Sequence, residues 1–447
     1  MARTTRSVAQ TPSSPEELMG QHLFSLLLSY LESLLARLDD RLDKRLVRTF
    51  ILGVVAIVQV RHRAEGLWLR RLGSWLLSPR QAVSGAKRLW RLLRKGEVVA
   101  EEVEAFLLAQ GDAYVAKGKE QGQKVLAVWD DSEWEKPSQV QGEGMCWVRS
   151  LKGERLQKAG SKFGKKPRET MTVPGMHWMQ VILTGLAQTP VLVAMRWWSS
   201  RGAHAQTRME VCLEILTALA QRWEKMVIHI WDRGFAGAAW LLHAAREQVY
   251  FILRWPRAFP IWSMEGRKYA VKDLARRKRS QLHRYLWDRH RRCWRRVGIT
   301  YMYVFHPSSP IPLTLVIARL KNRRPWYLLT NIPVSTLEEA WDIVRMYYQR
   351  WDVETSYRLA KSEWGFESVR VHRLSCRRNL LAMASIAHAF LLYLWYSSWR
   401  IWAQVALDIW AHRPGRWTER VRLPLYRLRM ALSFVWQSSP PMAALRL

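Results

Sequence analysis

Cysteine is scarce in this sequence of 447 residues, which contains only Cys146, Cys212, Cys293 and Cys376. The four cysteines lie far apart and form no CxxC pair, which argues against a zinc ribbon and against a disulfide framework. This usage suits a reducing cytosol, so we expect a cytoplasmic protein. No signal peptide is visible, because the segment Met1–Glu16 is polar and contains Ser and Pro.

Acidic residues are also few. Asp and Glu number 37 against 71 Lys and Arg, which leaves a formal net charge of +34. Such an excess is hard to explain without a polyanionic partner, because neutralising phosphates releases condensed counterions and so drives binding to nucleic acid. A ribosome-like binder or a membrane-surface protein is the alternative. The charge balance favours a nucleic-acid partner.

Long apolar runs are rare as well. The run Ile51–Val60 is too short to cross a bilayer. The run Leu380–Trp399 is long enough, but it contains polar residues such as Ser385 and His388 and follows a cluster of arginines. A buried helix packed on a catalytic core is therefore favoured over a membrane span. We expect no membrane partner.

Apolar residues nevertheless make up 49% of the chain, which is enough for a sizeable core and too many for a disordered protein. At roughly 100–200 residues per domain, the length allows roughly two to four domains. Tryptophan is unusually frequent at 26 residues. We expect most of these indoles to lie in the core or at interfaces, and only a few to stack on bases.

The N-terminal part, residues 17–115, shows the helical spacing of apolar residues, for example at Leu23, Leu27 and Leu34. Lysines and arginines are dense between Arg41 and Lys95, where they alternate with tryptophans. This density favours a helical DNA-binding domain. A solvated basic face on a helical bundle is the alternative interpretation.

From about residue 122 the pattern changes to short apolar runs that alternate with amphipathic segments. The expected order is strand Lys124–Trp129, strands His177–Thr184 and Val191–Trp198, helix Met209–Trp223, strand Met226–Trp231, helix Gly237–Gln248 and strand Val249–Leu253. This order predicts an α/β fold with a mixed sheet flanked by helices. The polar stretch 138–172 between the first two strands is expected to be a mobile loop near DNA.

The alternation stops after residue 255. The β-type runs Ile299–Phe305, Leu313–Ile317 and Trp326–Thr330 predict a β-rich insertion, which also carries an intensely basic stretch at 275–296. The predicted parts are a helical N-terminal DNA-binding domain (1–118), a catalytic core in two pieces (119–255 and 334–375), the insertion (256–333) and a helical C-terminal region with a dimerisation role (376–447).

Two aspartates directly follow predicted strands, Asp130 after the first and Asp232 after Met226–Trp231. If these strands are parallel neighbours, both acids emerge at the same edge of the sheet. Clustered carboxylates suit metal-assisted phosphodiester cleavage, and Mg²⁺ prefers oxygen ligands. A lone aspartate after a strand is a weak signal, because many such residues are caps or turn residues.

A third acid lies on a long helix expected from Thr336 to Trp364, which has a capping box at Ser335 with Glu338 or at Thr336 with Glu339. At about 100° per residue, one stripe about 60° wide holds four polar residues. They are Tyr347, Arg350, Glu354 and Lys361. A helix that lines an active-site groove would show such a stripe beside its apolar face. A solvated face with an Arg350–Glu354 pair fits the spacing equally well.

These residues resemble a known family. The spacing Tyr347-x2-Arg350-x3-Glu354-x6-Lys361 matches without a gap the Y-R-E-K signature of the insertion-sequence-four family of DDE transposases. The family's two aspartate motifs are similar to Asp130-Asp131-Ser132 and to Asp232-Arg233-Gly234, with Asp131 as an alternative first ligand. The family also places a β-rich insertion between the second Asp and the Glu.

The resemblance implies an RNase H-like catalytic core in which Asp130, Asp232 and Glu354 bind two Mg²⁺ ions, for which Mn²⁺ can substitute. Water would nick one strand at the transposon end, and the freed 3′-hydroxyl would attack the opposite strand to give a hairpin. After hydrolysis of the hairpin, the same hydroxyl would attack target DNA. The implied partners are the terminal inverted repeats, target DNA and a second copy of the chain in the synaptic complex.

The resemblance also implies DNA contacts. Tyr347, Arg350 and Lys361 would position backbone phosphates beside Glu354. Three further DNA-binding residues are implied: Trp326, Arg254 and Arg233. Trp326 would stack on an extruded base, and an ordinary strand tryptophan is the alternative. The expected location is the bacterial cytoplasm, in association with the nucleoid. Two other classes remain open, a catalytically inactive, domesticated DNA-binding protein and a simple nuclease of the same fold.

Overall fold

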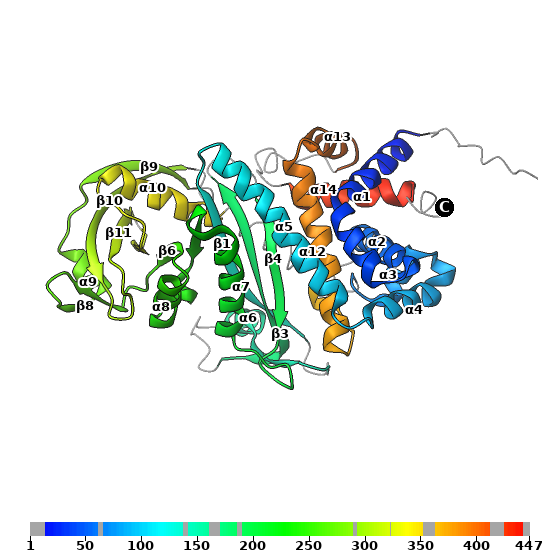
Figure 1. Cartoon of the computed structure of the whole chain (residues 1–447), viewed down its shortest axis with the longest axis horizontal. Helices are drawn as coiled ribbons and strands as arrows, with labels where there is room; N and C mark the ends of the chain where they lie inside the picture. Colours follow the sequence, from blue (N-terminus) through cyan, green and yellow to red (C-terminus); the bar gives the residue numbers. More distant parts are fainter. Residues whose placement is uncertain are drawn as a thin grey trace, which may run out of the picture. The chain divides into compact units, whose positions relative to one another are not determined.

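The computed structural model describes residues 14–60, 66–136, 142–160, 170–185, 190–288, 293–321, 323–351, 363–411 and 424–440 (Figure 1). The chain divides into two compact units, one made of Met1–Phe106 with Arg358–Leu447 and the other of Leu107–Tyr357. The first unit therefore combines the predicted N-terminal and C-terminal helical regions. The second combines the core strands with the insertion.

The first unit is helical throughout its described residues. Its helices are α1 (Pro15–Arg41), α2 (Lys44–Gln59), α3 (Leu69–Leu76), α4 (Ala82–Leu93), the start of α5 (Val98–Glu120), α12 (Leu374–Tyr396), α13 (Arg400–Trp410) and α14 (Leu425–Ser438). Helix α2 is buried along nearly its whole length, which accounts for the apolar run in the sequence. Helix α12, expected to pack on the catalytic core, packs against α2, α4 and α14.

Helix α12 contains most of the long apolar run that could be mistaken for a membrane span. Within the described residues, no single helix has both the length and the apolar character needed to cross a bilayer. One pair of helices, Leu374–Trp395 and Arg400–Trp410, reaches that length and composition when taken together, but the two are bent by 99°. Most side chains of α12 are buried inside the unit.

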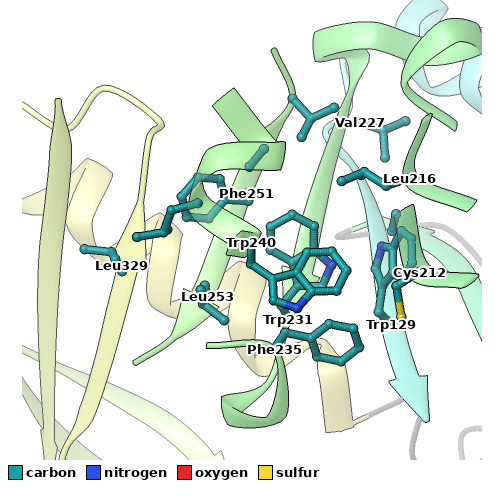
Figure 2. Packing of buried hydrophobic residues seen from close by; sticks show 14 of the residues in the cluster. Trp129, Cys212, Leu216, Val227, Trp231, Phe235, Trp240, Phe251, Leu253 and Leu329 are labelled. Carbon is teal, nitrogen blue, oxygen red and sulfur yellow. The ribbon is translucent and has the colours of Figure 1, made fainter. Parts of the chain in front are cut away.

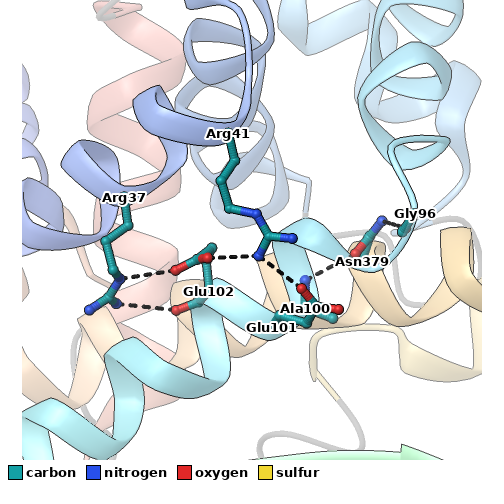
Figure 3. Close-up of polar contacts among 7 residues, drawn as sticks. All are labelled: Arg37, Arg41, Gly96, Ala100, Glu101, Glu102 and Asn379. Carbon is teal, nitrogen blue, oxygen red and sulfur yellow. Dashed lines mark hydrogen bonds and ion pairs between the residues drawn. The ribbon is translucent and has the colours of Figure 1, made fainter.

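Polar side chains connect helices α1, α5 and α12 within this unit (Figure 3). Arg37 lies 3.1 Å from the Glu102 carboxylate, and Arg41 donates to Glu101 and Glu102 at 2.8 Å. The fully buried amide of Asn379 donates to the carbonyl of Gly96 at 2.7 Å. Because a buried amide without a partner is costly, these bonds favour one arrangement of the helices over others.

The described strands of the second unit form one sheet. Its strands are β1 (Val125–Glu135), β2 (Cys146–Arg149), β3 (Thr172–Gly185), β4 (Val191–Trp198), β5 (Val227–Trp231), β6 (Tyr250–Arg254), β7 (Pro260–Ser263), β8 (Lys268–Ala270), β9 (Leu282–Asp288), β10 (Cys293–Phe305), β11 (Leu313–Leu320) and β12 (Trp326–Thr330). The strand order is β2-β3-β1-β5-β6-β12-β11-β10-β7-β8, with β4 also paired to β3 and β9 to β10.

Helices flank this sheet, and four short 3₁₀ turns occur in the described chain. The remaining helices are α6 (Leu151–Gly160), α7 (Arg208–Trp223), α8 (Ala238–Arg246), α9 (Val271–Arg276) and α10 (Leu337–Tyr348). The 3₁₀ turns are Pro79–Gln81, Glu224–Met226, Arg233–Phe235 and Phe366–Ser368. The stretch predicted to be a mobile loop contains β2 and α6, so that prediction is wrong for residues 146–160.

Strand directions identify the core of the sheet. β3 is antiparallel to both β1 and β4, and β1, β5 and β6 are mutually parallel. The order β4-β3-β1-β5-β6 with these directions confirms the RNase H-like mixed sheet flanked by helices. The β-rich insertion is confirmed too, and its last strand, β12, pairs antiparallel with β6. The insertion therefore extends the core sheet.

An aromatic cluster lies on one face of this sheet, beneath α7 and α8 (Figure 2). The indole rings of Trp129 and Trp231 lie 6.2 Å apart, and Trp231 lies 5.2 Å from Trp240 of α8. Phe235 and Phe251 complete the contacts around Trp231. Burying side chains of this size contributes strongly to stability, so the ends of β1 and β5 are held tightly together.

One buried histidine belongs to this cluster. His229 of β5 is only 1% exposed, and its Nδ1 accepts a hydrogen bond from the Trp129 indole at 3.0 Å. Burial lowers the pKa of His229 to about 3, because the charged imidazolium cannot be hydrated there. Accepting the indole N–H is also possible only for the neutral ring.

We expect this histidine to make folding pH-dependent. The unfolded chain binds a proton below about pH 6.5, whereas the folded chain binds it only near its lowered pKa, so stability falls as the pH falls from about 6.5 towards 3. Between pH 7 and 5, His229 should account for a loss of about 2 kcal/mol. Urea unfolding of wild type and of His229→Gln at pH 7 and at pH 5, followed through a signal from the second unit, measures this loss of stability. Equal pH slopes in both proteins would contradict it.

Candidate active site

The first predicted acid, Asp130, lies inside a strand and not at its end. β1 continues to Glu135 because β3 pairs with it along its whole length, up to Glu135 opposite Gly175. The parallel pairing of β1 with β5, in contrast, has its last pair at Val128 and Ile230. Asp130 and Asp232 are each two residues beyond that pair, so the register brings them to the same level at the edge expected from the sequence.

Side-chain alternation decides which face these acids occupy. Trp129 and Trp231 point into the aromatic cluster beneath α7 and α8. Successive side chains of an extended chain point to opposite faces, and the backbone at Asp232 is still extended (φ −83°, ψ −174°). Asp130 and Asp232 therefore belong to the opposite face. Both are partly buried.

The neighbouring Asp131 has a different environment. It belongs to the face covered by α7, where its carboxylate accepts two hydrogen bonds from Arg208, at 2.7 and 3.0 Å. Such a bidentate pair fixes the carboxylate and neutralises its charge. The geometry thus favours Asp130 over Asp131 as a metal ligand.

Arg208 also holds the turn that follows Asp232. Its guanidinium donates to the carbonyl of Gly234 at 3.1 Å and lies 4.3 Å from the centre of the Phe235 ring. The Asp232 carboxylate accepts from the backbone N–H of Gly234 at 2.7 Å. Arg208 and Asp131 therefore connect β1 to the turn that orients Asp232.

Helix α10 supplies the next residue of the site. It begins with a capping box in which the Thr336 hydroxyl accepts from the Glu339 N–H, which selects one of the two predicted boxes. Tyr347, near its end, is fully buried, and burial raises the pKa of its hydroxyl against the opposing effect of Arg350 and Arg254. The Asp232 charge raises this pKa further, so the phenol is close to the second acid.

Among the described residues, no acceptor for the proton of the Tyr347 hydroxyl lies within hydrogen-bond distance, and the Arg254 guanidinium that lowers the pKa of this hydroxyl can only donate. A buried hydroxyl whose proton has no acceptor costs free energy, and such groups in native proteins call for an explanation. The charges of Asp232, Arg254 and Arg350 all act on the pKa of this phenol, a setting in which it can donate a hydrogen bond to an incoming oxygen.

The single long helix predicted from 336 to 364 is not continuous. α10 ends at Tyr348, Gln349 forms a turn, and residues 350 and 351 are again helical. Glu354 and Lys361 lie outside the described residues, so the predicted polar stripe stays a prediction. Arg350 is largely buried at 8% exposure. Gly365 has the left-handed conformation expected of a helix stop (φ 64°).

The other predicted DNA-binding residues occupy different positions. Arg254 ends β6, partly buried, and Arg233 is exposed at the start of the 3₁₀ turn after Asp232. Trp326 begins β12 and is 7% exposed, with its ring 5.6 Å from that of Tyr347 and 6.5 Å from that of Tyr348. Stacking on a base would require the indole to leave these partners.

Two residues of this site were not found from the sequence. Arg208 is the first residue of α7, directly after the capping Thr207. Nothing in the sequence around it indicates the ion pair with Asp131. Gln180 is the cross-strand partner of Asp130, is fully buried, and has neither amide atom hydrogen-bonded among the described residues. Directly opposed residues share a face, so this amide lies beside Asp130. The only feature of the sequence that could have indicated Gln180 is that it is a polar residue within the apolar run of β3.

The donor set suits a hard divalent cation. Within the described residues, no three His, Cys, Asp or Glu side chains form a metal-binding group. Asp130 and Asp232 provide two carboxylates at one level of the sheet, and Glu354, the third predicted ligand, lies outside those residues. Carboxylate oxygens are the ligands that Mg²⁺ prefers, so the residues present fit this ion.

We expect Arg208→Ala to loosen the turn after Asp232. The pair with Asp131 is about one-third exposed, so its loss should cost about 1 kcal/mol, and amide hydrogen exchange at residues 233–236 should accelerate. Arg208→Lys should restore only part of the protection, because an ammonium cannot bridge both partners as a guanidinium does.

The control for that change is Arg222→Ala on the same helix, which removes an exposed ion pair with Asp112. This variant should leave exchange in the turn as in wild type. The proposed link between Arg208 and the Asp232 turn fails if the two alanine variants show the same exchange at residues 233–236.

Comparison with known proteins gives the family. The family described as "Transposase DDE domain" matches residues 136–390, a range that includes Asp232 and Glu354 and begins after Asp130. No curated protein matches the chain. Among solved structures, the chain aligns with piggyBac transposase in a synaptic complex with hairpin DNA, with 13% identity and a TM-score of 0.40 over 94% of this chain and 81% of that one. Since the family match covers more than half of the sequence, the chain belongs to the transposase DDE domain family.

Proposed function

We propose that the protein is the DNA transposase of a bacterial insertion sequence of the insertion-sequence-four type. It binds the ends of its element, cleaves phosphodiester bonds there and joins the 3′-hydroxyl ends to target DNA. The observation that carries this proposal is the level placement of Asp130 and Asp232 on the sheet face opposite the aromatic cluster. Tyr347, which is close to Asp232, begins the sequence motif that leads to Glu354.

Asp130, Asp232 and Glu354 would hold two Mg²⁺ ions, and Mn²⁺ would substitute for them. When bound, such a pair supplies activation of the attacking oxygen and stabilisation of the leaving oxygen. Asp232 is prevented from turning away by its hydrogen bond from Gly234. Gln180 would orient Asp130 or its ligands from the neighbouring strand.

Three basic or hydroxyl groups beside Asp232 would position the substrate. The buried Tyr347 hydroxyl would donate a hydrogen bond to a phosphate oxygen, and the Arg254 and Arg350 guanidinium groups would balance its negative charge. Lys361 would make a further phosphate contact. Because the site is partly buried, these charges act in a lower dielectric than bulk water, which strengthens each of them.

The ends of the element would be bound largely by the helical unit. Exposed cations on α3 and α4 and their flanks support this assignment. They are Arg70, Arg71, Arg80, Lys87, Arg91, Arg94 and Lys95. Two copies of the chain would bring the two inverted repeats together in a synaptic complex, in the cytoplasm of a bacterium and in association with its nucleoid.

We expect Asp130→Asn and Glu354→Gln to lower Mg²⁺-dependent nicking of a transposon-end duplex by more than about 100-fold, since a lost metal ligand removes several kcal/mol of transition-state stabilisation. DNA binding should persist in both variants. Removing the metal with a chelator should abolish nicking in the wild type. Gel assays of nicked and joined products measure each step.

Asp131→Asn is the matched control. It changes an adjacent carboxylate that faces Arg208, so it should retain metal-dependent nicking at a reduced rate. If Asp131→Asn abolishes nicking and Asp130→Asn does not, the assignment of the first ligand is wrong. DNA binding by the wild type without any nicking would instead support an inactive DNA-binding protein, and nicking without joining would support a simple nuclease.

The proposed reaction includes a hairpin intermediate in which Trp326 stacks on an extruded base. We expect Trp326→Ala to block hairpin formation more than first-strand nicking, and Trp326→Phe to restore part of it. Denaturing gels separate nicked, hairpin and hydrolysed products. Equal loss of both steps in Trp326→Ala would favour a structural role, consistent with the packing of its ring against Tyr347.

A further inference from the structure

A cationic cavity of about 270 Å³ opens in the second unit, at the junction of the core sheet and the insertion. Its lining residues come from the turn after β5, the end of β6, α9, the end of β11 and the start of β12. Seven of them are cations and none is acidic: Arg233, Arg254, Arg257, Lys272, Arg276, Arg319 and Arg324. Positive charges gathered around one cavity repel each other unless an anion is bound there.

The structure offers little internal compensation for these charges. Arg276 forms an exposed ion pair with Asp273 at 3.4 Å. Four of the cations make no ion pair within the described residues: Arg233, Arg257, Lys272 and Arg324. A protein commonly neutralises clustered arginines with nearby carboxylates, and this cavity leaves them available for a ligand.

The walls of the cavity are held by hydrogen bonds. The Arg319 guanidinium donates to the carbonyls of Ala275 and Lys278, each at 2.7 Å, which fixes it against the end of α9. The backbone N–H of Lys272 donates to the carbonyl of Arg257 at 3.1 Å. Trp255 extends the pairing of β6 with β12 through its N–H to Tyr327. These bonds fix the backbone around the cations before any ligand binds.

The cavity adjoins the proposed active site. Arg233 is bonded directly to Asp232, and Arg254 is close enough to Tyr347 to lower the pKa of its hydroxyl. A ligand held by these arginines would therefore lie next to the second acid. The cavity is smaller than the roughly 300–1,000 Å³ typical of sites for drug-sized ligands, so it suits a compact anionic group.

We propose that this cavity binds a backbone phosphate of the DNA strand that leaves the active site towards the insertion. The inference rests on the proposed function, because it takes DNA as the substrate. It adds a second anchoring point on that strand, formed by Arg257, Lys272 and Arg324, none of which belongs to the motifs at the acids. The anchor fixes the position of the strand without reading its sequence, since the cations meet phosphate and not base edges.

The first test compares two variants of equal charge. Arg257→Gln with Lys272→Gln removes two cavity cations, and Lys117→Gln with Lys119→Gln removes two exposed cations at the end of α5. Binding of a labelled transposon-end duplex by the full chain is measured over a range of salt. The cavity variant should lower the slope of log K against log[salt] by about 0.9 for a lost phosphate contact, and the control should not. Equal slopes in both variants would overturn the proposal.

The second test locates the phosphate. Single neutral methylphosphonates are placed in turn along the strand that flanks the cleavage site, and each duplex is bound by wild type and by the cavity variant. At the phosphate held in the cavity, the substitution should weaken binding by wild type about tenfold and have little effect on the variant, because the two changes remove the same contact. Additive effects at every position would contradict the proposal.

Two further outcomes keep the proposals distinct. If wild type shows the expected salt slope and phosphate coupling but no metal-dependent nicking, the transposase activity fails and the cavity proposal stands. If inorganic phosphate protects the wild type from thermal unfolding through these cations, and the variant keeps the wild-type salt slope, the cavity binds free phosphate and the DNA proposal fails. Arg257→Lys with Lys272→Arg should restore the slope, which excludes a folding defect as its cause.

Discussion

The candidate active site depends on the parallel pairing of β1 with β5. That pairing covers a few residues only, but it sets the register in which Asp130 and Asp232 come to one level. On the sheet face covered by α7 and α8, this pairing is strengthened by the packing of Trp129 against Trp231. It is also strengthened by the hydrogen bond that the Trp129 indole donates to the neutral His229. A slip of β1 by one residue would move Asp130 to the opposite face and take Trp129 out of the aromatic cluster, so burial of the indole specifies the position of the carboxylate.

Arginines on two sets of elements influence the region around these acids. On the α7 side, Arg208 neutralises Asp131 and fixes the turn after Asp232. Near Tyr347, the charges of Arg254 and Arg350 lower the pKa of the hydroxyl and that of Asp232 raises it. Asp130 and Asp131 therefore have different environments although they are adjacent in sequence, and only Asp131 is bonded to Arg208.

The order of the main elements could be predicted from the sequence, because apolar runs and amphipathic segments alternate clearly between 122 and 255. The extension of β1 beyond Trp129 could not, since Asp130 and Asp131 look like the end of a strand until the partner strand β3 is known. β2 and α6 were missed in a polar stretch whose pattern resembles a loop. The role of Arg208 required tertiary contacts, and the turn at Gln349 gave no local signal such as Gly or Pro.

The junction between β6 and β12 has a mechanical consequence. Besides three backbone pairs, the Asn331 side chain bonds to Phe251 and Val249 across it, so the core and the insertion share one hydrogen-bonded ladder. A hinged lid needs a connection that can change its torsion angles freely, and this ladder would have to break first. The distance between the carboxylates and the arginines of the insertion is therefore nearly constant. In the proposed reaction, a duplex that contacts both would have to adapt its own curvature to the protein, which favours easily deformed sequences over stiff ones.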